Sequence, residues 1–455
     1  MNLKNARFYV ICFLFCLGIF ALGYSFPRSS FYTNFFIYSA LFVFYGYLYI
    51  KADTGRLIKQ LLLLGVMVRL LLLVSLPPWS DDYVRFIWDG HQMYQGHSPY
   101  SNKPSEVLET RSDFFLEQLF PLLNSPDYYS VYPPSNQLLF AMAVWLAGEN
   151  LLVAVMVMRL FLLAFEILTF YLIIQLLRNL GLPSKKVLLY ALNPLVIMEI
   201  VGNLHFEGMM LSFILVGFLL LIQSMYTLSG LALGAAVAIK LSPLILVPAF
   251  FQYLSKRAFV RFFFGGLLLI VLGFYPVFGK NYYSGFFESL SLYVDSFEFN
   301  ASVYYIIRQL GFWIEGYNVI GYWGPILKIV ALSMILFITF RQKIQDHHSF
   351  LNTIMLIYWM FFLFSTVVHP WYIIPAFGLS LFTKQNSFLI WTYLIFLSYH
   401  AYQQEPYQEN IWVLLLEYIM LYMAIWADHK GWWCKILSKE KFWGLMNFSV
   451  SSPRS

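Results

Sequence analysis

Charged residues are scarce in this chain, and their scarcity indicates its class. Only 11% of the 455 residues are Asp, Glu, Lys or Arg, whereas 60% are hydrophobic and 20% are aromatic. A water-soluble globule has no interior large enough to bury that much apolar surface, so the composition excludes a soluble protein and predicts an integral membrane protein. The many Phe, Tyr and Trp residues are typical of lipid-facing helices with aromatic belts at the membrane interfaces.

Cysteine and several functional motifs are also lacking. Two of the three cysteines, Cys12 and Cys16, lie in one apolar segment and Cys434 lies in a basic tail, which excludes a disulfide framework. The sequence has no glycine-rich phosphate loop, no HExxH zinc pair and no alternation of strands with helices. These absences disfavour ATP-driven transport and an internal domain that uses nucleotide sugars.

Apolar runs of helical length recur along the whole chain and predict an all-α, polytopic membrane fold with about 12 full spans plus a half-helix pair. Segment 137–148 is too short for a comfortable crossing, so we expect it at the membrane interface. Lys240 and Pro243 interrupt segment 228–254 and predict two half-length helices there. The predicted full spans are 8–24, 35–50, 57–76, 152–177, 187–201, 208–225, 262–278, 319–340, 350–368, 371–383, 388–402 and 411–427.

Lys and Arg are unevenly distributed between the predicted connections. If the N-terminus is cytoplasmic, 19 of the 29 fall on the inner side and six on the outer side, as the positive-inside rule requires. The net charge of +6 is then an orientation signal that needs no nucleic acid as partner, and we expect an inner (plasma) membrane location. The predicted divisions are two N-terminal helices (1–56), a membrane module (57–318) with outer loops 77–135 and 279–318, C-terminal helices (319–429) and a basic cytoplasmic tail (430–455) able to contact anionic lipid.

An acid pair, Asp81 and Asp82, follows directly on the apolar run 57–76. Adjacent carboxylates at a bilayer surface suit proton abstraction or cation binding, although a solvated loop pair without a role is the plain alternative. The outer loop 77–135 is acidic and rich in Trp and Tyr, whose flat faces suit sugar rings as well as lipid headgroups.

With this topology other unusual polar residues reach the same outer side. Each has a plain alternative, because a histidine at a helix end is often only hydrogen-bonded and a membrane lysine can snorkel. Their convergence on one face nevertheless predicts a site, since intramembrane ionisable groups are costly unless used. These residues are Asn203, His205, Glu207, Lys240, Arg308, His369, Trp371 and Tyr372.

The motifs, taken in order, resemble the C-type (GT-C) glycosyltransferases over about residues 57–375. The resemblance is greatest to polyprenyl-phosphate-mannose-dependent mannosyltransferases, including the catalytic subunit of the first mannosyltransferase of GPI-anchor assembly and its bacterial relatives. It implies an Asp in the first outer loop as catalytic base, a lipid-monophosphate sugar as donor and inverting transfer. The motifs are Asp81-Asp82-Tyr83, Trp88-Asp89-Gly90, Gly96-His97-Ser98-Pro99-Tyr100, Tyr132-Pro133-Pro134, Asn193-Pro194, Gly202-Asn203 through Glu207-Gly208, Lys240 through Pro243, and His369-Pro370-Trp371-Tyr372.

The chemistry of the residues agrees with this reading. Asp82 or Asp81 can remove the acceptor proton, and Lys240, helped by Arg308 or His369, can meet the departing phosphate. Glu207 could act as a nucleophile in a retaining mechanism, but we expect it to bind donor-sugar hydroxyls. The further candidates for donor or substrate binding are Arg85, Trp88, Asp89 and Tyr132.

Several alternatives stay open at this stage. No cofactor is required by the mechanism, although Asp81 and Asp82 could hold Mg²⁺ or Mn²⁺. Two helices precede the Asp-bearing loop, and the paired acids leave open which one is the base. The expected partners are a polyprenyl-phosphate sugar donor, a lipid-linked, glycan or protein acceptor of the cell envelope, and membrane lipid. A secondary transporter or lipid flippase is the main rival, and a lipid-linked glycan ligase or polymerase is a third possibility.

Overall fold

The computed structural model describes residues 3–278 and 282–431, and the secondary-structure elements of these residues are helices joined by loops. This part of the chain contains no β-strand; its one isolated bridge joins Phe299 and Val367. The prediction of an all-α fold is therefore confirmed. Lys280, Cys434 and nearly all of the predicted tail 430–455 lie outside the described residues.

Seven described helical segments are long and apolar enough to cross a membrane, which confirms an integral membrane protein. The predicted 12 spans are not confirmed, because the described residues reach a count of eight even when one bent helix pair is included. The seven lie in α1 (Leu3–Tyr24), α2 (Phe31–Lys51), α8 (Leu151–Asn179), α14 (Lys256–Phe274) with η5 (Tyr275–Phe278), α17 (Ile320–Arg341), α18 (His347–Phe364) and α21 (Ile411–His429).

The remaining apolar runs form shorter or broken helices. The run predicted at 57–76 becomes α3 (Gly55–Leu71), which has 17 residues. The runs predicted at 371–383 and 388–402 become η6 (Pro370–Ile373), α19 (Ile374–Ser380), α20 (Ser387–Leu394) and η7 (Ile395–Gln403). Every residue of α19 is buried within the protein, so its apolar character serves internal packing.

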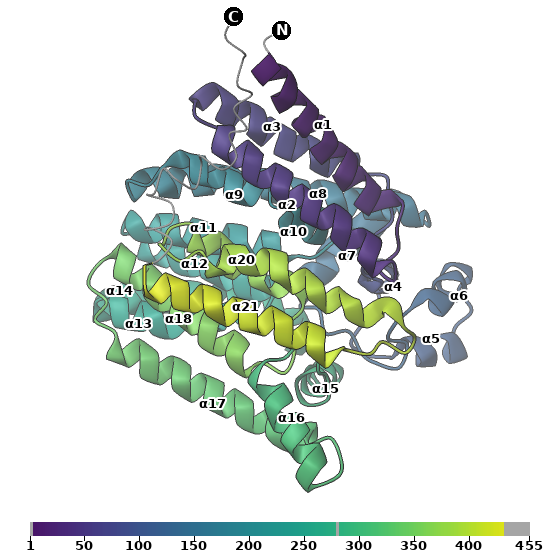
Figure 1. The fold of residues 1–455 in the computed structure, drawn as a ribbon. Coiled ribbons are helices and arrows are strands. Elements are labelled where there is room, and N and C mark those ends of the chain that lie inside the picture. Colours follow the sequence, from purple (N-terminus) through teal and green to yellow (C-terminus); the bar gives the residue numbers. More distant parts are fainter. Residues whose placement is uncertain (1–2, 279–281, 432–455) are drawn as a thin grey trace, which may run out of the picture.

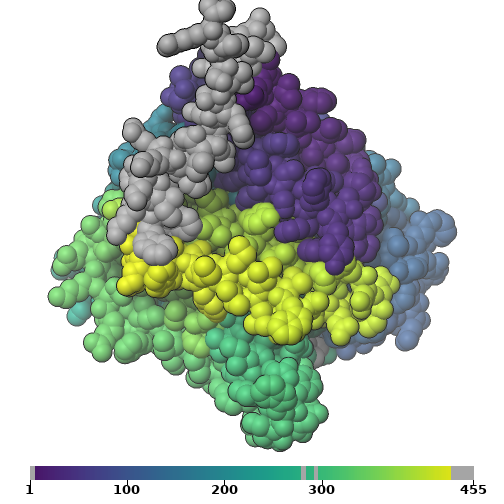
Figure 2. Space-filling model, in the orientation of Figure 1, coloured from purple at the N-terminus to yellow at the C-terminus, as the bar shows by residue number. Residues whose placement is uncertain are grey.

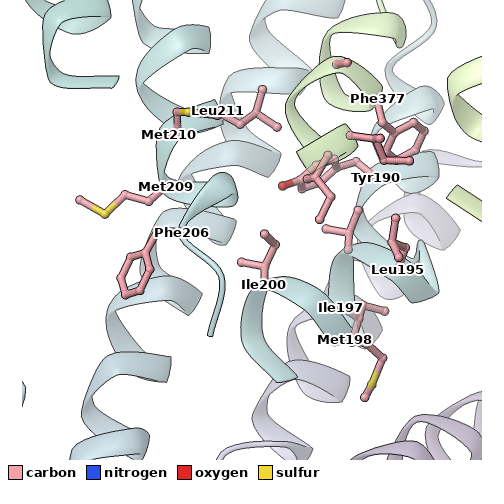
Figure 3. Packing of buried hydrophobic residues seen from close by; sticks show 14 of the residues in the cluster. Tyr190, Leu195, Ile197, Met198, Ile200, Phe206, Met209, Met210, Leu211 and Phe377 are labelled. Atoms are coloured by element: carbon pink, nitrogen blue, oxygen red, sulfur yellow. The ribbon is translucent and has the colours of Figure 1, made fainter. Parts of the chain in front are cut away.

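The bent pair consists of α10 (Pro194–Val196) continued by η3 (Ile197–Gly202), a π-helical segment, and of α11 (Glu207–Ile222). The two halves meet at 109°, and the connecting residues include Asn203 and His205. Figure 3 shows the apolar side chains around this bend, where Ile200 and Phe206 belong to one continuous core. The chain therefore places buried polar groups, such as Asn203 and His205, at a break between two helices that are packed in apolar surroundings.

A second break lies at Lys240, as predicted. Helix α12 (Tyr226–Ile239) ends there and is followed by η4 (Ser242–Leu246), with Pro243 in its first turn, and α13 (Val247–Tyr253). Helix α12 packs very closely on α14: a Cβ added at Gly230 would lie 1.9 Å from the carbonyl oxygen of Phe262. Small residues allow such close approach of membrane helices, and here the contact fixes the first half of α12 against α14.

The outer loop forms short helices gathered beyond one end of the long helices α1, α2 and α21 (Figure 1). Near another edge of the molecule, the segment around α16 projects from the body (Figure 2). The helices of the loop and of the rest of the chain are α4 (Asp82–Tyr94), α5 (Pro104–Thr110), α6 (Phe114–Leu119), η1 (Phe120–Leu122), α7 (Pro134–Ala147), η2 (Ser184–Lys186), α9 (Val187–Ala191), α15 (Tyr282–Asp295) and α16 (Val303–Ile314).

Two buried arginines tie the membrane helices together. Arg69 pairs with Glu166 at 2.7 Å, and Tyr190 donates to the same carboxylate at 2.8 Å. Arg159 instead donates to five backbone carbonyls: those of Leu72, Leu73 and Ser75, which follow α3, and those of Val201 and Gly202 at the end of η3. Arg159 therefore links the chain entering the outer loop to the chain entering the bend.

Candidate active site

The acid pair lies at the start of α4, and its two carboxylates have different neighbours. Asp81 forms an ion pair with Arg28 at 2.6 Å. Asp82 is the first residue of α4 and accepts hydrogen bonds from the Tyr132 hydroxyl at 3.2 Å and the Asn124 amide at 3.0 Å. Both acids are partly exposed. A cation engages Asp81, whereas the hydrogen bonds to Asp82 come from two neutral groups, a hydroxyl and an amide.

The next turns of α4 hold the outer loop together. Arg85 pairs with Asp89 one turn later at 2.7 Å and also donates to the carbonyls of Ser125 and Tyr128. Asp89 is fully buried, and Trp88 is 2% exposed. The side chains of Arg85, Trp88 and Asp89 are thus engaged inside the loop, where they hold the segment that ends in Tyr132 against α4.

Glu207 and Lys240 come from the two helix breaks and form an ion pair with each other. Glu207 is almost completely buried, and its second carboxylate oxygen has no hydrogen-bond partner among the described residues; the Lys240 side chain is 25% exposed. The Lys240 ammonium also lies 4.8 Å from the centroid of the Tyr372 ring. An ammonium has three donors, so Lys240 retains the capacity to bind an anion on its exposed side.

A carboxylate that the sequence analysis missed organises the bend. Glu199, on η3, is fully buried and accepts hydrogen bonds from Asn203 at 3.1 Å, from His205 Nδ1 at 3.1 Å and from the Tyr399 hydroxyl at 2.7 Å. The side-chain Oδ1 of Asn203 accepts a hydrogen bond from the backbone N–H of Trp79, two residues before Asp81. Glu199 is a lone acidic residue in an apolar run. The same feature had identified Glu207, so it could have identified Glu199 from the sequence.

Aromatic rings connect the two predicted histidines. Trp371 stacks between His205, with centroids 3.6 Å apart, and His369, with centroids 4.5 Å apart. The other face of His369 is met by Phe299 at 4.7 Å, and Tyr372 contacts its edge. Within the described part of the chain, His205 Nε2 and His369 Nδ1 are buried without a hydrogen-bond partner, so both can serve a bound polar group.

Arg308 lies apart from this cluster. It pairs with Glu298 at 2.5 Å and covers the Tyr305 ring at 3.9 Å. Glu298 directly precedes Phe299, the residue that contacts His369, so Arg308 is connected to His369 through two intervening residues, Glu298 and Phe299. Its role in phosphate binding stays a prediction.

Two sets of contacts bring the acid pair toward the Lys240 region. The Phe86 ring lies 4.9 Å from the Tyr132 ring and 5.6 Å from Phe206, the residue before Glu207. Asn136, which follows Tyr132 at the start of α7, donates to the carbonyl of Ile239 at 3.0 Å. The structure thus brings the outer loop, the bend and the break at Lys240 into one assembly of contacts, although they are far apart in the sequence.

The described residues contain no group of three or more His, Cys, Asp or Glu side chains close enough to hold a metal ion. A Mg²⁺ or Mn²⁺ ion shared by Asp81 and Asp82 would have to displace Arg28 from Asp81. Metal dependence at this pair stays a prediction.

The comparisons with known proteins agree with this arrangement. The chain belongs to the family described as Alpha-(1->6)-mannopyranosyltransferase, N-terminal domain, whose profile matches residues 28–256. It is therefore a membrane glycosyltransferase of a GT-C mannosyltransferase family, as the motifs indicated. The matched part includes Asp81, Asp82, Glu207 and Lys240. No curated protein and no solved structure matches the chain significantly.

The stability of the protein should depend on pH through His369. Burial, followed by the charges of His205 and Lys240, lowers the pKa of His369 from 6.5 to about 3. Between about pH 6.5 and pH 3, His369 is protonated in the unfolded chain but neutral in the folded chain. Its contribution to the free energy of unfolding therefore falls as the pH falls from about 6.5 to about 3. At pH 5 the loss is about 2 kcal/mol.

Thermal unfolding of the purified protein in detergent, measured between pH 8 and pH 5, checks this expectation. The melting temperature of the wild type should fall more steeply than that of His369→Gln, which cannot titrate at this position. Identical slopes for the two proteins would contradict it.

Proposed function

We propose that the protein transfers mannose from a polyprenyl-phosphate sugar to a lipid-linked, glycan or protein acceptor at the extracytoplasmic face, with inversion at the anomeric carbon. One observation carries the proposal: in a chain of a mannosyltransferase family, Asp82 is partly exposed and accepts hydrogen bonds from two neutral groups, the Tyr132 hydroxyl and the Asn124 amide. Membership of this family favours the enzyme over the transporter and flippase alternatives.

The proposed step is a single displacement. Asp82 accepts the proton of the acceptor hydroxyl as that oxygen forms a bond to the anomeric carbon. The bond between the anomeric carbon and the phosphate oxygen breaks, and polyprenyl phosphate departs with the bonding electrons. Lys240 stabilises the charge that develops on this phosphate, and Glu207 orients Lys240 through their ion pair.

The name of the family supports a finer proposal for the product. Its members are described as alpha-(1->6)-mannopyranosyltransferases, so we propose an α-(1→6)-linked mannose as the transferred unit. Inversion then requires a β-linked donor.

Incubation of the purified protein with a panel of polyprenyl-phosphate sugars and membrane lipid extract, followed by mass spectrometry, tests the proposal. A product heavier by one hexose, formed from the mannose donor only, is the expected result. Linkage analysis should then give an α-(1→6) bond. Transfer from a nucleotide sugar without a lipid donor would refute the donor assignment.

The proposed orientation can be tested by cysteine labelling. In a background lacking Cys12, Cys16 and Cys434, single cysteines replacing the exposed Ser101 and Glu405 should react with an impermeant reagent in intact cells. Cysteines replacing Arg257 and Lys343, which are also exposed, should react only after permeabilisation. The reverse pattern would place the acid pair on the cytoplasmic side.

A further inference from the structure

The segment around α16, which projects from the body of the protein, has one exposed apolar side (Figure 2). Its exposed apolar residues recur at intervals of three or four residues, which places them on the same side of a helix. Trp313 is 73% exposed and Ile314 is 76% exposed, and Tyr317 follows in the turn after the helix. We call this surface the α16 apolar face; it consists of Ile306, Leu310, Trp313, Ile314 and Tyr317.

The opposite side of α16 is attached to the protein. Tyr304 is fully buried and its hydroxyl donates to Glu298 at 2.6 Å, and Arg308 pairs with the same carboxylate at 2.5 Å. Gly311 packs against the start of α17, because a Cβ added there would lie 2.6 Å from the side chain of Val319. These contacts fix the rotation of the helix, so the α16 apolar face points away from the body.

The α16 apolar face continues into the surface of a membrane span. Helix α17 begins shortly after α16 and is one of the seven helices long and apolar enough to cross a membrane. Its exposed apolar residues also recur every three or four positions, from Tyr322 through Ile326 to Ile329. Such a stripe on a spanning helix faces the hydrocarbon of the bilayer. The two apolar surfaces therefore adjoin where α17 begins.

Contacts of the preceding segment show on which side of the membrane α16 lies. On α15, the Ser289 hydroxyl donates to the carbonyl of Tyr129 at 2.8 Å. Closer to α16, the Phe297 ring lies 6.3 Å from the ring of Tyr128. Both partners belong to the loop 77–135, so α16 lies at the end of the spans where the acid pair is located.

We propose that α16 is an interfacial helix whose apolar face inserts into the lipid bilayer, on the side of the acid pair. Continuity with the lipid-facing stripe of α17 favours lipid over a protein partner. Trp and Tyr are the residues enriched where spans meet the membrane surface. Charge is also scarce, since Arg308 and Glu315 are the charged residues of 303–319 and Arg308 is paired on the inner side. A helix of this kind sinks about 5–10 Å into the boundary between headgroups and acyl chains.

Insertion of α16 would set the depth of part of the candidate active site. Glu298 holds Tyr304 and Arg308, and the next residue, Phe299, stacks on His369 with centroids 4.7 Å apart. A helix held at a fixed level in the interface therefore also holds the segment that meets His369. This support involves no contact between α16 and the reacting groups.

Quenching of a fluorescent label tests the proposal on the full-length protein in phosphatidylcholine nanodiscs. In the background lacking Cys12, Cys16 and Cys434, a bimane label is attached to a cysteine that replaces Trp313. We expect strong quenching by lipids with a nitroxide near the headgroup and weak quenching by aqueous iodide. A label replacing the exposed Ser101 of the outer loop should show the reverse, and one replacing Ile329 should be quenched most by a nitroxide deep in the acyl chain.

Quenching of the Trp313→Cys label by iodide but not by lipid would overturn the proposal, provided that the labelled protein melts at the wild-type temperature. Protection from both quenchers would refute it as well, because protein would then cover the face. Oxidative cross-linking between cysteines at position 313 would identify that protein as a second copy of the chain. These readouts do not involve sugar transfer, so they are independent of the proposed enzyme activity.

Discussion

Asp82→Asn should abolish sugar transfer while leaving the protein folded. The substitution preserves the shape of the side chain and one acceptor oxygen for the hydrogen bond from Asn124 or Tyr132, but it removes the basic carboxylate. Loss of a general base slows a reaction by about 10²–10⁴-fold. The rate of mannose transfer from a polyprenyl-phosphate donor, compared with the wild type at equal amounts of folded protein, measures the effect.

Asp81→Asn is the matched control, because it makes the same change one residue away. Asp81 faces Arg28, so its loss should lower the rate much less than the loss of Asp82. A fully active Asp82→Asn with an inactive Asp81→Asn would reverse the assignment of the base. Two active variants would refute the mechanism.

Lys240→Met should lose donor affinity and turnover together, since the same phosphate is bound in the ground state and gains charge in the transition state. The structure adds a second effect, because methionine leaves the buried Glu207 without its cation. Removing one partner of a buried pair costs about 3–5 kcal/mol. We therefore expect Lys240→Met to be both inactive and less stable.

A double variant separates these two effects. Lys240→Met combined with Glu207→Gln removes both charges, so thermal stability should recover toward that of the wild type while transfer remains lost. Lys240→Arg keeps the charge on a wider planar head and should retain a fraction of the activity. Wild-type donor affinity and turnover in the double variant would remove Lys240 from the site and leave Arg308 and His369 as the candidates for phosphate binding.

Hydropathy predicted the broken helix at Lys240 well and the number of spans poorly. A lysine and a proline inside an apolar run have a direct physical cost, so the break could be read from the sequence. An apolar run does not reveal whether it faces lipid or protein. The run at 371–383 is apolar because α19 is buried in the protein, and its division into short helices depends on neighbours that the sequence does not identify.

The same limit applies to the candidate site. Asp82, Glu207 and Lys240 were predicted because ionisable groups near lipid are unusual, and Glu199 could have been found on the same ground. The contacts of each group could not be predicted. Arg85 and Asp89 lie in a motif as prominent as that of Asp82, yet the structure shows them paired inside the loop.

The position of Arg159 limits how the protein can move during a catalytic cycle. One guanidinium holds the carbonyls that precede the acid pair and those that precede His205, so the two segments cannot separate unless several charge-assisted hydrogen bonds break together. The segments carrying the proposed base and the bend should therefore move as one rigid unit.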